Sequence, residues 1–95
     1  MRVSSIEVSA TGITRTGHRQ RALSAAAIRR LYLYTDSNGD EALVARGPGL
    51  RLQFISRREL LDPAVRRGVN ALIDAVHTNG EVDANVPAYL ASLAV

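Results

Sequence analysis

Residues 28–54 read IRRLYLYTDSNGDEALVARGPGLRLQF and carry the clearest strand pattern in the chain. Three runs in which apolar and polar residues alternate are separated by an Asn38-Gly39 turn and by Gly47-Pro48-Gly49. Alternation at a period of two is typical of strands that bury one face, and Asn-Gly suits the primed turn of a tight hairpin. We therefore predict a three-stranded antiparallel meander over residues 28–55.

The alternation also assigns two faces to this meander. The expected core face carries Leu31, Leu33, Leu43, Ala45, Leu50, Leu52 and Phe54. The opposite face would carry Arg30, Tyr32, Tyr34, Arg51 and Gln53. Aromatic rings beside guanidinium groups suit three roles: packing between neighbouring strands, a protein interface, or a surface that stacks single-stranded bases.

The segments before the meander predict two further strands. Residues 3–9 alternate, with Ile6 and Val8 on one side, and Gly12 follows in a turn. Residues 13–23 are polar and interrupted near Gly17, which favours a bent edge strand, because charged side chains discourage edge-to-edge pairing. Residues 24–27 predict a single helical turn that begins at Ser24.

A helix closes the domain. Asp62 is a good N-cap, Pro63 suits the first helical position, and the helix is expected to run to about residue 78. Its apolar stripe consists of Val65, Val69, Leu72, Ile73 and Val76. Just before it, Ser56 and Glu59 have the spacing of a capping box.

The fold class is therefore α+β: about five antiparallel strands packed by one amphipathic helix. We expect residues 1–80 to form a single domain. Residues 81–95 are expected to form a tail, in which Pro87 opens a short helix with Tyr89, Leu90 and Leu93. So short a helix is marginal by itself in water, so it would dock on this domain or on a partner.

The order of these pieces resembles the small bacterial pleckstrin-homology-like domains. SIEVSATGITRTG is similar to their first hairpin, SAAAIRRLYLY to their third strand and LDPAVRRGVNALIDAV to their closing helix. The resemblance covers about residues 3–78 and implies a partial or complete barrel of seven strands, of which the pattern predicts five. In lipid-binding members, basic residues near the first hairpin grip a phosphorylated headgroup, and Arg15, Arg19 and Arg21 fit that arrangement.

The charge is distributed unevenly along the chain. All twelve basic residues are arginines and the net charge is +3. Residues 1–35 hold six arginines and one acid, whereas residues 36–95 hold six arginines and eight acids. A basic first third can meet an anion such as nucleic acid or a lipid headgroup. The candidate anion-binding residues are Arg15, Arg19, Arg21, Arg29 and Arg30.

Several chemistries find no support in the sequence. There is no cysteine, and neither G-x-x-x-x-G-K-[ST] nor G-x-G-x-x-G occurs. Two separate histidines, His18 and His77, make a poor metal site. We expect no cofactor, no metal and no enzymatic activity. Without a signal region or an apolar run of about 18 residues, the chain is expected to be cytoplasmic.

Two functions follow from these patterns. The first is a small non-enzymatic interaction module that binds a protein partner or itself. Its candidate interface residues are Tyr32, Tyr34, Arg51, Tyr89, Leu90 and Leu93. The alternative is anion binding through the arginine-rich first third.

Overall fold

The computed structural model describes residues 5–16, 21–49 and 51–93, and it divides the strands between two sheets. The first sheet has the order β1-β2-β3, with β1 at Ser5–Ser9, β2 at Gly12–Thr16 and β3 at Arg21–Ser24. The second has the order β6-β5-β4-β7, with β4 at Arg30–Thr35, β5 at Glu41–Arg46, β6 at Leu52–Ser56 and β7 at Glu81–Val82. The helical elements are η1 (Ala25–Ala27), α1 (Arg57–Leu60), α2 (Pro63–Val76) and α3 (Asn85–Leu93).

The antiparallel meander is confirmed, but the single five-stranded sheet is corrected to two sheets with seven strands. The predicted edge strand over residues 13–23 is two strands, β2 and β3, and the expected bend near Gly17 lies outside the described residues. The 3-10 turn η1 carries the chain between the sheets. Ala25 N donates to Thr11 O at 2.9 Å on one side, and Arg29 N donates to Arg46 O at 2.7 Å on the other.

The predicted helix signals are confirmed. Ser56 Oγ accepts from the Glu59 amide at 3.2 Å, and Glu59 Oε1 accepts from the Ser56 amide at 3.0 Å. Asp62 caps α2 through the Ala64 amide at 2.9 Å. All five stripe residues of α2 are buried. Ser24 precedes η1 but makes no side-chain capping bond.

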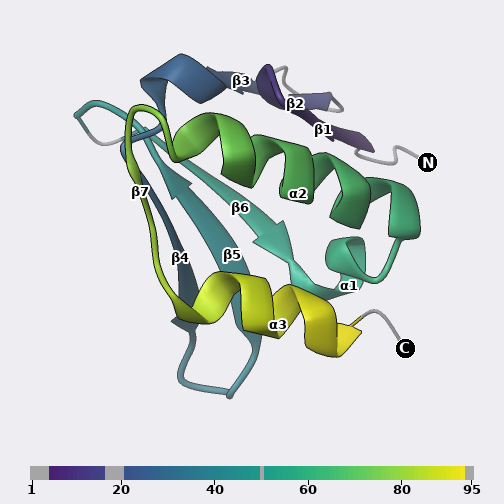
Figure 1. The fold of residues 1–95 in the computed structure, drawn as a ribbon. Helices are drawn as coiled ribbons and strands as arrows, with labels where there is room; N and C mark the ends of the chain where they lie inside the picture. The colour runs from purple at the N-terminus through teal and green to yellow at the C-terminus, as the bar shows by residue number, and fades with distance from the viewer. Residues whose placement is uncertain (1–4, 17–20, 50, 94–95) are drawn as a thin grey trace.

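The core lies between the two sheets and the helices, and it is built from a single cluster of apolar side chains. Figure 1 shows α2 and α3 on the same side of the second sheet. The tail belongs to this globule, because β7 pairs in parallel with β4 and α3 buries Val86, Leu90 and Leu93. Of the two possibilities for the terminal helix, the structure shows docking on its own domain.

The facing of β6 differs from the prediction. Leu52 and Phe54 are exposed, whereas Gln53 and Ile55 point inward, with Gln53 only 6% exposed. The reason is the register, which pairs Ile55 with the buried Leu43 and Phe54 with Val44. Leu50, the third residue assigned to the core from this strand, lies outside the described residues.

Candidate protein-binding face

The inverted facing of β6 produces an apolar surface on the outside of the second sheet. Directly paired residues on neighbouring strands share a face, so the register defines three rows across β4, β5 and β6. We call the side of these strands that points away from the core the open face. Its rows are Arg30, Arg46 and Leu52; Tyr32, Val44 and Phe54; and Tyr34, Ala42 and Ser56.

Exposed apolar side chains gather on the open face. Tyr34 is 50% exposed, Phe54 47% and Leu52 39%, and Leu61 is the one other large apolar residue of this kind among those the structure describes. Val44 is 1% exposed although it lies outside the core cluster. It is flanked across the strands by Tyr32 and Phe54. The middle row is therefore a continuous apolar strip on a face that neither α2 nor α3 covers (Figure 1).

Charged groups at one end of the open face are balanced. Arg30 donates two hydrogen bonds to Asp83, at 2.9 and 2.8 Å, and its guanidinium carbon lies 4.7 Å from the centre of the Tyr32 ring. The hydrogen bonds from Arg30 lower the pKa of Asp83 below its usual value. Arg30 is paired with Glu81 of β7 on one side and with Arg46 of β5 on the other. Two cations and two anions thus offset each other.

The structure does not gather the five candidate anion-binding arginines into one site. Arg15 is held by Glu59, at 2.6 and 3.0 Å, and also donates to Phe54 O at 2.8 Å. Arg30 is engaged by Asp83 on the second sheet. Arg21 on β3 and Arg29 before β4 are exposed, and Arg19 lies outside the described residues.

The six candidate interface residues also separate. Tyr32 and Tyr34 lie on the open face, as predicted from the alternation of β4. Arg51 precedes β6 and reaches to β3, where it donates to Ala22 O at 3.4 Å. Leu90 and Leu93 are buried in the core, and Tyr89 is half-buried against it. Burial raises the pKa of the Tyr89 hydroxyl.

The residues that complete the open face were missed by the sequence reasoning. Leu52 and Phe54 were assigned to the core, and Val44 and Arg46 were given no role. Ile55 was the available signal: it alternates with Phe54, so burying it beside Leu43 must turn Phe54 outward. A strand that is apolar on both faces indicates that the second face of its sheet is either covered by another element or takes part in binding.

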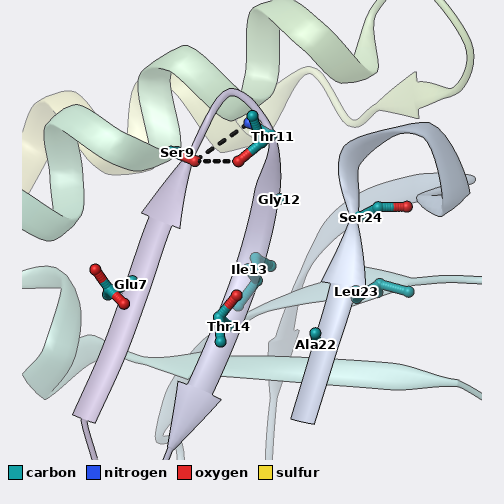
Figure 2. A pocket seen from close by; sticks show the side chains of 9 residues that line it. All are labelled: Glu7, Ser9, Thr11, Gly12, Ile13, Thr14, Ala22, Leu23 and Ser24. Atoms are coloured by element: carbon teal, nitrogen blue, oxygen red, sulfur yellow. Dashed lines mark hydrogen bonds between the residues drawn. The ribbon is translucent and has the colours of Figure 1, made fainter.

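A second surface feature is a shallow hollow of about 320 Å³ on the outer side of the first sheet. Figure 2 shows Glu7, Thr14 and Ala22 side by side on its three strands. Gly12 leaves one end of the hollow without a side chain, while Ser9 Oγ and Thr11 Oγ1 form a 2.7 Å hydrogen bond there. Its lining mixes polar side chains such as Glu7 and Thr14 with the apolar Ile13 and Leu23.

Comparison with known proteins finds no matching family model, no matching curated protein and no matching solved structure. Within residues 5–16, 21–49 and 51–93, no helix is both long and apolar enough to cross a membrane.

Proposed function

We propose that this protein is a small non-enzymatic interaction module that binds a protein partner through the open face. The observation that carries the proposal is the gathering of Tyr34, Leu52 and Phe54, all more than one third exposed, on one side of one sheet. Half-exposed aromatic side chains offer about 100 Å² each. The three together reach on the order of 250–300 Å², close to the largest apolar patch of a typical monomer, which is often functional.

The composition of the open face supports a protein partner over a folding role alone. Packing between strands accounts for Val44, which its neighbours cover. It does not account for Tyr34 and Phe54, each of which remains about half exposed. Tyrosine, phenylalanine and arginine are enriched where proteins meet, and the open face carries all three.

Anion binding remains the alternative prediction. Arg21 and Arg29 are exposed and make no ion pair within the described chain. Arg21 lies on β3 and Arg29 lies between η1 and β4. The two other described arginines of the set are already held by carboxylates. Binding to a polyanion that weakens steeply with salt would favour this alternative.

A photo-crosslinking side chain placed on the open face tests the proposed function. Phe54 is replaced by a benzophenone amino acid, and the protein is irradiated in its native cells. The matched control carries the same group at Leu61, which is equally exposed at 47% but lies outside the open face. We expect discrete protein adducts at position 54 and none at position 61. Equal adducts at both positions, or none at either, would contradict the proposal.

A further inference from the structure

We propose that the occupant of the open face is a second copy of this chain. The β6-β5-β4-β7 sheets of the two copies then pack face to face across a two-fold axis. This inference rests on the proposed function and names its partner. Flat apolar sheet faces pack on each other about 10 Å apart, as in β-sandwiches. A symmetric pair needs a surface that complements itself, and the rows of the open face meet this condition.

Charge selects the direction of the axis. An axis parallel to the strands and running along β5 would place Arg46 over Arg46 of the partner subunit, and two like charges would meet. An axis perpendicular to the strands, through the middle row, places Arg30 over Tyr34 of the partner subunit and Arg46 over Ala42 of the partner subunit. The Arg30 guanidinium then meets the aromatic ring of Tyr34 of the partner subunit, which is an attractive contact. The apolar middle row of one copy packs on the middle row of the other.

The charges on the open face also cancel, although the whole chain has a positive net charge. Arg30 and Arg46 are balanced by Glu81 and Asp83, two cations against two anions, whereas the whole chain carries +3. Repulsion between two copies of a cationic protein is weakest where the facing surfaces are neutral. A nucleic acid or an anionic lipid surface would require a net positive face instead.

The size of the apolar strip sets the strength of the pair. The apolar surface of the open face is on the order of 250–300 Å². If apolar atoms make up about 60–65% of the interface, each copy buries roughly 450 Å². The total of about 900 Å² is below the roughly 1,200–2,000 Å² of stable complexes. We therefore expect a reversible dimer with a Kd of roughly 10 µM to 1 mM.

Sedimentation equilibrium from micromolar to near-millimolar concentration tests the dimer. The weight-average mass of the intact chain should rise with concentration from 10.2 kDa toward twice that value. Phe54→Arg should hold it at the monomer mass, and Tyr34→Arg should do the same if Phe54→Arg does not fold. Leu61→Arg should behave like the wild type. A wild-type monomer at every concentration, or a Leu61→Arg variant that also stays monomeric, would overturn the inference.

A disulfide tests the axis, because the chain has no native cysteine. The perpendicular axis brings Phe54 opposite Phe54 of the partner subunit. Under mild oxidation, Phe54→Cys should form a covalent dimer much faster than Leu61→Cys. Equal rates would reject this arrangement. If position 54 cross-links in cells to proteins of other masses while the purified chain stays monomeric, the self-pairing fails and the interaction module stands.

Discussion

Arg15 shows how a single side chain joins three parts of the chain. It lies on β2, and its guanidinium bonds the Glu59 carboxylate of α1 and the Phe54 carbonyl of β6. Burial alone would raise the pKa of Glu59, but the hydrogen bonds from Arg15 and from the Ser56 amide lower it below its usual value. Arg15 is therefore engaged inside the fold, where it fastens the first sheet to the second.

This pair predicts a stability that depends on pH. A lowered pKa in the folded state means that the stabilisation is complete above the unfolded value near 4.3 and is lost as pH falls through the folded value. Because both side chains are about a quarter exposed, we expect Glu59→Gln to reduce the free energy of unfolding by about 0.5–1.5 kcal/mol at neutral pH. The difference from wild type should shrink at pH 3.

Urea unfolding of both proteins at pH 7 and pH 3 measures this difference. Asp74→Asn, a change of the same kind on the exposed side of α2, is the control and should shift stability by less than about 0.5 kcal/mol. A Glu59→Gln defect of equal size at both pH values would show that the Arg15 ion pair contributes nothing.

At the scale of elements, α2 and β1 approach each other more closely than side chains allow. A Cβ on Gly68 would lie 1.9 Å from the Val8 carbonyl oxygen. The glycine is in mid-helix, where it costs about 1 kcal/mol relative to alanine. The close approach lets α2 pack along β1, and all five apolar stripe residues of the helix are buried. Figure 1 shows β1 beside α2.

Gly68→Ala should therefore destabilise the protein despite the better helix propensity of alanine. We expect a net loss of about 1–3 kcal/mol, since the clash is with backbone and one of the two elements must move. Thermal melts followed by circular dichroism measure it. Asn70→Ala, an exposed position of the same helix, should leave the melting temperature unchanged or slightly higher. A more stable Gly68→Ala variant would contradict the contact.

The elements that could be predicted from the sequence are those with local signals. The capping box at Ser56, the Asp62-Pro63 start and the stripe of α2 each depend on residues within a few positions, and all are confirmed. The seventh strand could not be predicted, because the pairing of β4 with β7 joins residues about fifty positions apart. The ion pair between Arg15 and Glu59 could not be predicted for the same reason.

The face of β6 was predicted wrongly for a physical reason. Leu52 and Phe54 are apolar on one side of the strand, and Ile55 is apolar on the other. The hydrophobic pattern alone favours burying Leu52 and Phe54, because that facing leaves the polar Gln53 on the surface. Pairing with β5 decides otherwise, because Leu43 must meet Ile55. The candidate site could be predicted only in part, through Tyr32 and Tyr34.

At the scale of the whole molecule, the second sheet separates two apolar regions. The core lies between this sheet, the helices and the first sheet, and the open face lies on the other side of β4, β5 and β6 (Figure 1). One strand, β6, contributes to both, with Ile55 inward and Phe54 outward. The proposed interaction and the proposed self-pairing both depend on this facing.

Cysteine labelling along β6 measures that facing directly, since no native cysteine competes. Single variants Leu52→Cys, Gln53→Cys, Phe54→Cys and Ile55→Cys are treated with a maleimide in native buffer at low protein concentration, where the chain is monomeric. We expect fast labelling at positions 52 and 54, and labelling at positions 53 and 55 only after denaturant is added. Fast labelling at 53 and 55 with protection at 52 and 54 would contradict it.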